Sequence, residues 1–138
     1  MTAEERLEYV NYRIKSAFNT FDAAKVLADN GFWNSAVNRL YYAIFYSVNA
    51  LLVKNEIYVN SHSGMRSQFS LHFIKTGKLD KKYGALLAEL YDWRQKGDYD
   101  NIFDYDAESV KPLFEYVLEM ITQIDIEIKE QNGSPNHQ

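Results

Sequence analysis

The sequence predicts an all-α fold, an up-and-down bundle of about five helices, four of them long and one short. Apolar residues recur at steps of three and four along nearly the whole chain, which is the spacing of a buried helix face, and no segment alternates like a β-strand. The 138 residues suffice for one compact domain and are too few for two. Residues 1–130 are therefore predicted to form a single helical domain, and residues 131–138, QNGSPNHQ, a flexible C-terminal tail.

Two long helices are predicted in the first part of the chain, separated by Asn30-Gly31, a pair that favours the left-handed conformation at a helix end. The second of them begins at about Trp33 and ends near Asn55. The apolar stripe of the first helix consists of Leu7, Val10, Ile14, Ala17, Phe21, Ala24 and Ala28. The stripe of the second consists of Trp33, Val37, Leu40, Ile44, Val48 and Leu51.

A shorter helix and another long one are predicted to follow. Ser61 or Ser63 is a suitable cap for the short helix, and Thr76-Gly77 is a suitable end. Asp80 is a suitable cap for the next helix. The inward positions of these two helices are Met65, Phe69 and Phe73, then Tyr83, Leu87 and Leu90.

The last helix is predicted to begin between Asp106 and Ser109. Pro112 is tolerated there if it falls in the first turn, where its missing N–H costs little. The regular apolar spacing then continues to the end of the predicted domain. Its members are Val110, Leu113, Val117, Ile121, Ile124 and Ile128.

The composition narrows the location and excludes several classes of function. The chain has no cysteine, which excludes disulfides, cysteine-bound zinc and thiol chemistry and fits a reducing compartment. The N-terminus has no apolar signal core, and the longest apolar stretches are interrupted by Asn38, Arg39 and Asn49. A net charge of −4 argues against indiscriminate coating of nucleic acid but leaves room for a local basic cleft. We therefore expect a cytoplasmic protein without a membrane segment.

The sequence lacks the motifs of common catalytic and metal sites. No Glu is followed by His at the spacing that helical di-metal sites use, and His62, His72 and His137 are too scattered to be read as a ligand set. Gly-rich phosphate loops and the G-x-S-x-G elbow are absent. The stretch NSHSG is interpreted as a helix cap, because neighbouring Ser and His do not make a nucleophile and its base. We expect neither a metal nor a cofactor.

One charged residue continues the apolar stripe of the fourth helix. Tyr83, Leu87, Leu90 and Arg94 follow one another at steps of four, three and four. An unpaired guanidinium facing a core is too costly, so Arg94 must lie at the mouth of the bundle or have an anionic partner. Asp98, four residues on, can supply that partner, in which case the pair only stabilises the helix end.

The second helix has an unusual polar face. Ser35, Arg39, Tyr42 and Tyr46 recur at helical steps, beside Asn38 and Asn49. Phenols, amides and an arginine suit a subunit interface or a ligand cleft better than a solvent face, which prefers Lys and Glu. For Arg39 and Tyr42, buried hydrogen bonding or an interface and direct ligand contact both remain open. The eleven tyrosines likewise fit either the edge of a core or a surface on which bases stack.

Four segments together resemble the HEPN domain family, and more narrowly its small, single-domain prokaryotic branch. They are NSAVNRLYYAIFYSVNALL (34–52), HSG (62–64), FIKTGKL (73–79) and LYDWRQKGDYD (90–100). The resemblance covers roughly residues 3 to 130. It implies a helical bundle that forms a two-fold homodimer, with the ends of the second and fourth helices at a shared cleft. It also implies one of three activities: a toxin ribonuclease with an Arg-x(4–6)-His motif, a partner of a minimal nucleotidyltransferase, or a nucleotide-binding protein.

Arg94 falls on the motif arginine of that family, but the motif histidine is missing. This chain has Asp98 and Tyr99 at the fourth and fifth positions after Arg94. Cleavage of RNA needs groups that transfer protons near neutral pH, as histidine does, whereas tyrosine with a pKa near 10 is a poor base. A cleft made from these groups is better suited to gripping a phosphate than to cutting beside it.

Three hypotheses follow for the function. The first is a homodimeric module that binds nucleotide or RNA phosphate through Arg94, Tyr99 and Arg39, with a nucleotidyltransferase partner. The second is a metal-independent endoribonuclease, in which Arg94 stabilises charge and Asp98 or Tyr99 transfers a proton. The third is a structural role for the cluster at a helix end or dimer seam. In pairs of the resembling family the partner can also attach a nucleotide to a tyrosine near the motif, so Tyr99 is a candidate for modification.

Overall fold

The computed structural model describes residues 1–100 and 103–132, and over these residues the chain is built from helices alone. Five α-helices follow one another, and a π-helical turn, η1, extends the short third helix. The bounds are Ala3–Asp29 (α1), Trp33–Lys54 (α2), His62–Phe69 (α3), Ser70–Ile74 (η1), Lys81–Tyr99 (α4) and Ala107–Asn132 (α5). The predicted all-α bundle of four long helices and one short one is confirmed.

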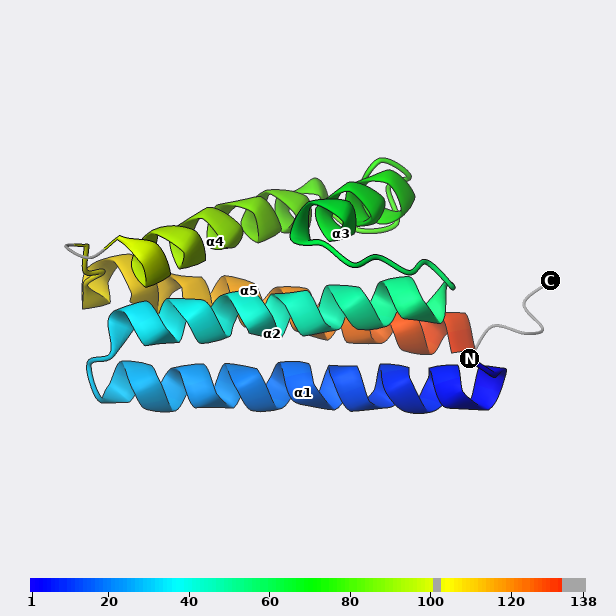
Figure 1. The fold of residues 1–138 in the computed structure, drawn as a ribbon, viewed down its shortest axis with the longest axis horizontal. Helices are drawn as coiled ribbons and strands as arrows, with labels where there is room; N and C mark the ends of the chain where they lie inside the picture. Colours follow the sequence, from blue (N-terminus) through cyan, green and yellow to red (C-terminus); the bar gives the residue numbers. More distant parts are fainter. Residues whose placement is uncertain (101–102, 133–138) are drawn as a thin grey trace.

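Helix α2 is the central element, because it packs against all four other α-helices. Figure 1 shows α1 lying lengthwise along one side of α2, α4 running along the opposite side, and α5 behind. The short helix α3 lies beside the first turns of α4. The last turns of α4 come back to the start of α2, so this end of the bundle brings together segments about sixty residues apart.

The predicted inward positions largely form the core. Every member of the stripe predicted for α2 is fully buried except Trp33, which is half-buried at the first turn. The three aromatic and sulfur side chains expected inside from the third helix, Met65, Phe69 and Phe73, are each about 99% buried. Leu7 is an error of prediction: it is 45% exposed, because the buried face of α1 begins only at Val10.

The helix ends differ from the sequence expectations in detail. Ser61, and not Ser63, caps α3, since its Oγ accepts a hydrogen bond from the Gly64 N–H at 2.9 Å. Pro112 lies in the second turn of α5, beyond the first turn that was expected. The same helix runs to Asn132, two residues past the predicted boundary of the domain, and the remainder of the predicted tail lies outside the described residues.

No helix within the described residues is both long and apolar enough to cross a bilayer.

Candidate functional site

One side of α2 is only half-buried and carries phenols and amides. Residues of α1, α3 and α4 contact this side. Tyr42, Tyr46 and Asn49 follow at steps of four and three, and all three are half-buried. Four of the five arginines of the chain and five of its eleven tyrosines meet along this side. We call this set the arginine–tyrosine face; its members are Arg13, Arg39, Arg66, Arg94, Tyr9, Tyr41, Tyr42, Tyr46 and Tyr91.

Each arginine of this face lies over at least one tyrosine ring. Arg13 lies 5.2 Å from the ring centre of Tyr9 and 5.0 Å from that of Tyr46. The Arg66 guanidinium is 4.4 Å from the ring of Tyr91. The Arg39 guanidinium lies over the Tyr42 ring in the same way, at 5.3 Å. A guanidinium that stacks on a ring keeps much of its edge free for other acceptors, so these contacts hold the arginines without using up their hydrogen-bond donors.

Arg94 is the most enclosed member of the face. Its side chain comes from the last turns of α4 and lies 5.3 to 5.5 Å from the ring centres of Tyr41, Tyr42 and Tyr91. The residue is only 7% exposed, so within the single chain it does not lie at an open mouth of the bundle, the first of the two placements expected for it. It does have the predicted anionic partner: Nη1 is 3.8 Å from Asp98 Oδ2.

This ion pair satisfies Arg94 only in part. The separation of 3.8 Å is too long for a hydrogen bond, and Nε is a buried donor with no partner in the described part of the chain. A guanidinium has five N–H donors, and a buried donor left without an acceptor costs free energy of folding, about 1–3 kcal/mol. Arg94 is therefore a positive charge that the fold holds in place without fully satisfying it.

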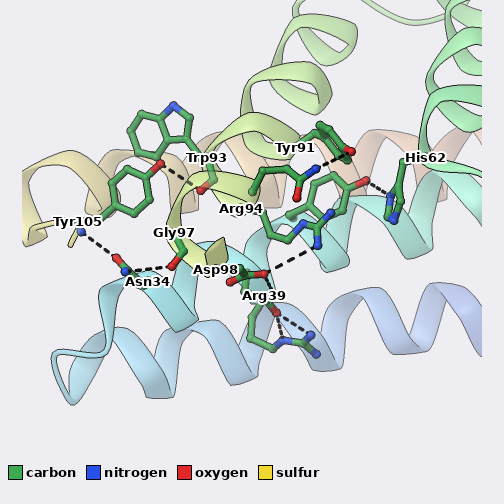
Figure 2. A network of polar contacts seen from close by, with 12 residues as sticks. Asn34, Arg39, His62, Tyr91, Trp93, Arg94, Gly97, Asp98 and Tyr105 are labelled. Atoms are coloured by element: carbon green, nitrogen blue, oxygen red, sulfur yellow. Dashed lines mark hydrogen bonds and ion pairs between the residues drawn. The ribbon is translucent and has the colours of Figure 1, made fainter. Parts of the chain in front are cut away.

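Asp98 links Arg94 to the surface of α2. Its Oδ2 also accepts a hydrogen bond from Asn38 Nδ2 at 2.9 Å, and Asn38 Oδ1 accepts two from Arg39, at 3.0 Å from Nε and 2.8 Å from Nη2 (Figure 2). The predicted residues Arg39 and Arg94 thus belong to one polar chain through Asp98. Tyr99 does not join it: this side chain is 71% exposed, and no polar or ring contact of it is seen within the described residues.

His62 is a member of the site that the sequence analysis missed. It is the first residue of α3, and its Nδ1 lies 2.6 Å from the hydroxyl of Tyr41 (Figure 2). Its ring centre is 5.2 Å from that of Phe45 and 5.4 Å from that of Tyr91. NSHSG was interpreted only as a cap, and helical spacing carries no information on which helix the start of α3 meets.

Burial favours the neutral forms of both His62 and Tyr41. Burial lowers the pKa of the His62 imidazole, and the positive charges of Arg94 and Arg66 lower it further. Burial also raises the pKa of the Tyr41 phenol, and this outweighs the opposite effect of Arg94. Since Tyr41 keeps its proton and is fully buried, the simplest arrangement has its O–H donating to His62 Nδ1. The imidazole then carries its own proton on Nε2.

The opposite side of the same α4 turns has a different character. Asn34, in the first turn of α2, donates to the carbonyl oxygens of Gly97 at 3.3 Å and Phe103 at 2.8 Å, and accepts from the Tyr105 N–H at 2.8 Å (Figure 2). The Tyr105 ring stacks on Trp93 with centres 4.7 Å apart, and its hydroxyl donates to the Trp93 carbonyl at 3.1 Å. We call these five residues the Asn34 clamp; it fixes the end of α4 and the connection to α5.

Within the described residues, no three His, Asp or Glu side chains gather in a way that would hold a metal ion. The arginine–tyrosine face itself offers guanidinium charges, N–H donors and aromatic rings. Such a combination suits an anion that also carries flat rings, since guanidinium groups bind phosphate and aromatic side chains stack on bases.

Comparison with known proteins places this chain in a family. A model of the HEPN domain matches residues 10–127, which is most of the chain. The chain belongs to the HEPN domain family. A UPF0332 protein of Thermotoga maritima is 37% identical to it over 107 residues, which cover 78% of this chain and 81% of that protein.

Two relatives of this HEPN protein carry names that state a role. Both come from Methanocaldococcus jannaschii. "Putative toxin MJ0142" is 37% identical over 100 residues, covering 72% of this chain and 68% of that protein. "Putative toxin MJ0605" is 35% identical over 105 residues, covering 75% and 78%. The predicted family is thus confirmed.

Proposed function

We propose that this HEPN protein binds single-stranded RNA, or a nucleotide derived from it, through the arginine–tyrosine face. The observation that carries the proposal is Arg94: a buried guanidinium with one donor that finds no partner among residues 1–100 and 103–132, and with a carboxylate 3.8 Å away. Native folds rarely leave such a group unsatisfied without a functional reason. A phosphate oxygen accepts hydrogen bonds from guanidinium strongly and would supply what Asp98 does not.

The surroundings of Arg94 support RNA over a simple anion. Half-buried rings of Tyr42, Tyr46 and Tyr91 lie beside arginines that come from four different helices. Single-stranded nucleic acid is held by this combination, in which positive charges follow the backbone and rings stack on bases. The net charge of −4 repels RNA from the rest of the surface, so binding is restricted to this face.

The assembly forms the second part of the proposal. We propose a two-fold homodimer in which the arginine–tyrosine faces of both copies line one cleft, acting in the cytoplasm with a minimal nucleotidyltransferase in a toxin–antitoxin-like system. The half-buried polar and aromatic character of the α2 face is what an interface or cleft requires. Exposed Tyr99 is accessible to such a partner enzyme, so its modification stays a prediction.

Titration of a fluorescein-labelled single-stranded RNA, followed by anisotropy at several salt concentrations, tests the binding. We expect saturable binding whose affinity falls with salt, and we expect Arg39→Gln to reduce the slope of log K against log salt by about 0.7. Lys111→Gln is the matched control, because it removes one positive charge from α5 on the α1–α5 side of the bundle, away from the arginine–tyrosine face. Binding that Arg39→Gln and Lys111→Gln weaken equally would overturn the assignment to this face.

The assembly has its own tests. Sedimentation of the purified protein should give the mass of a dimer, and co-expression with a nucleotidyltransferase encoded beside it should yield a complex. A monomer at all concentrations, or the absence of such a neighbouring gene, would leave RNA binding by the single chain as the surviving part of the proposal.

Cleavage of RNA is the alternative function, and His62 is the observation in its favour. An imidazole lies in contact with the tyrosines that enclose Arg94, so the site holds a side chain that can accept and donate a proton even though the motif histidine is absent. Asp98 and Tyr99 are weaker candidates, since one is tied to Arg94 and Asn38 and the other lies apart. Incubation of the protein with RNA, with Arg94→Ala as control, separates the two functions by whether any Arg94-dependent cleavage occurs.

A further inference from the structure

A pocket lies at the part of the arginine–tyrosine face formed by Tyr9 and Arg13, and His62 also lines it. It is a pocket of about 260 Å³ between α1, α2, the segment that precedes α3, and α3 itself. This volume is close to the lower end of small-molecule sites, which span about 300–1,000 Å³, so it would take part of a nucleotide. Its polar lining comes from Tyr9, Arg13, Asn49, Asn60, Ser61 and His62.

Hydrogen bonds among the lining residues determine which of their donors and acceptors remain free to bind a ligand. Arg13 Nε donates to the Tyr9 hydroxyl at 3.0 Å, and that hydroxyl donates to Asn49 Oδ1 at 2.8 Å. These two bonds use the only oxygen of the Asn49 amide and one of the five donors of Arg13. The Asn49 amino group and the four terminal N–H groups of Arg13 make no hydrogen bond or ion pair within the described residues.

His62 adds a donor of the same kind. The Tyr41 hydroxyl occupies Nδ1 at 2.6 Å, so the neutral imidazole carries its proton on Nε2, the nitrogen that remains for the pocket. No Asp or Glu is among the residues that line it. The leftover capacity on Arg13, Asn49 and His62 thus consists of N–H donors, and one of these groups bears a full positive charge.

The apolar lining limits what else the ligand contains. Phe45, Val59 and Met65 form the remaining walls, and the Phe45 ring is the larger apolar surface among them. A compact anion attached to a flat or sugar-like group fits donors on one side and apolar atoms on the other. The larger groove between α1 and α5 offers no such selectivity, because Lys25 and Lys111 share it with Asp29 and Glu115.

We infer that this pocket, which we call the Arg13 pocket, is a phosphate subsite: Arg13, Asn49 and His62 Nε2–H bind the phosphate of a nucleotide while Arg94 serves a neighbouring phosphate. The inference rests on the proposed function for the identity of the ligand as RNA or a nucleotide. It goes beyond that proposal by assigning one phosphate to a defined set of donors on α1, α2 and α3, separate from Arg94 near the end of α4.

Calorimetric titration of the full-length protein with adenosine 5′-monophosphate, adenosine and the dinucleotide ApA tests the subsite. We expect adenosine to bind at least tenfold more weakly than the phosphate-bearing probes, since hydrogen bonds to a charged group contribute about 1.5–3 kcal/mol. If the monophosphate binds more tightly than ApA, the pocket binds the terminal phosphate of a nucleotide chain. If ApA binds as tightly or more tightly, the pocket binds a phosphodiester within the chain. Adenosine that binds as well as both would overturn the inference.

Substitutions identify the residues. Arg13→Gln should weaken monophosphate binding about tenfold or more, and His62→Phe, which keeps a ring among the tyrosines but removes the donor, should weaken it several-fold. His62→Gln, which restores an N–H donor, should recover part of that loss. Lys15→Gln is the matched control, because it removes one exposed positive charge from the same helix without touching the pocket. Unchanged binding in folded Arg13→Gln protein, or an equal loss in Lys15→Gln, would overturn the assignment.

The subsite and the proposed function fail in different ways. If RNA binding depends on Arg39 but Arg13→Gln leaves monophosphate and RNA affinity unchanged, the Arg13 pocket is wrong and RNA binding stands. If Arg13 is required for the monophosphate but no RNA binds, the subsite stands and the proposed function is wrong.

Discussion

The last two turns of α4 present two sides that satisfy their polar groups very differently. On one side, the Asn34 clamp ties Gly97, Phe103 and Tyr105 to the start of α2 through three hydrogen bonds of 2.8 to 3.3 Å. On the other side, Arg94 has a 3.8 Å ion pair and a buried Nε with no partner in the described part of the chain. The two sides belong to the same turns of one helix. The difference in how completely their polar groups are hydrogen-bonded therefore comes from the residues that each side meets.

This contrast separates a structural role from a functional one. A group kept for stability is expected to have its hydrogen bonds complete, as Asn34 has, because each missing one costs free energy of folding. A group kept for a ligand is expected to gain partners only when the ligand arrives. Arg94 therefore belongs to the site and Asn34 to the scaffold that holds it, and substitutions on the two sides should have opposite consequences.

Asn34→Ala should have the largest effect on stability. It removes the donors to Gly97 and Phe103 and the acceptor for the Tyr105 N–H, which together contribute about 2 kcal/mol to the free energy of unfolding. Urea denaturation measures this loss, and RNA affinity below the transition should stay unchanged. Asn19→Ala, at an exposed position of α1, is the control and should change stability by less than about 0.5 kcal/mol. Equal stability of the two variants would show that the Asn34 clamp does not stabilise the fold.

Arg94→Met should show the reverse. Methionine fills similar space among the tyrosine rings, and it removes a buried charge that the fold leaves partly unsatisfied, so stability should be unchanged or higher. RNA affinity should fall about tenfold or more, because one charge-assisted contact to phosphate is lost. Denaturation and anisotropy on the same preparation give both quantities. A folded Arg94→Met protein with undiminished affinity would contradict the functional role of this side.

Two glycines of α4 extend the comparison along the helix. A Cβ at Gly97 would lie 3.2 Å from Cε2 of Tyr105, whose ring is fixed by Trp93 and by its hydroxyl bond, whereas a Cβ at Gly84 would make ordinary contacts with Ile74 at 3.4 Å and beyond. We expect Gly97→Ala to destabilise by about 1 kcal/mol and Gly84→Ala to stabilise by about 0.5–1 kcal/mol. Thermal or urea unfolding checks the signs. Stabilisation by both substitutions would show that the Tyr105 ring moves aside, and destabilisation by both would contradict the assignment of Gly84 to an ordinary contact.

The His62 imidazole should have the smallest effect on the free energy of unfolding, and this effect should change with pH only in the acidic range. Its pKa is lowered in the folded protein, so the unfolded chain binds a proton more readily and stability is lost as the pH falls below the unfolded value of about 6.5. Above that pH the contribution is fully present. The difference in unfolding free energy between the wild type and His62→Gln should therefore change with pH only below about 6.5. A difference that stays constant from pH 7.5 to pH 5 would show that the imidazole is not perturbed.

The sequence predicted what depends on local spacing. Helical steps placed Arg94 on the inward stripe of α4 and Asp98 one turn away, and both positions are confirmed. The polar face of α2 was recognised in the same way, from the residue types at Arg39, Tyr42 and Tyr46.

What the sequence did not predict depends on which helix faces meet. His62 reaches Tyr41 because α3 begins against the middle of α2, and Asn34 reaches Gly97 and Tyr105 because α4 returns to the start of α2. Periodicity identifies the buried side of each helix but does not fix its neighbours. The sequence also left open whether Arg94 lies at the mouth of the bundle, and it could not show that three tyrosine rings from two helices enclose the guanidinium.

The central claim is that Arg94 gains its missing partner from RNA, and ¹⁵N NMR of the arginine Nε–H groups tests it most directly. The chain has only five arginines, and single Arg→Lys variants assign them. Arg6, which pairs with Glu56 at 3.6 Å and is not one of the four arginines of the face, is the internal reference. On saturation with single-stranded RNA, the account predicts a shift of the Arg94 signal while the Arg6 signal stays in place. RNA that binds while the Arg94 signal remains unmoved would contradict it.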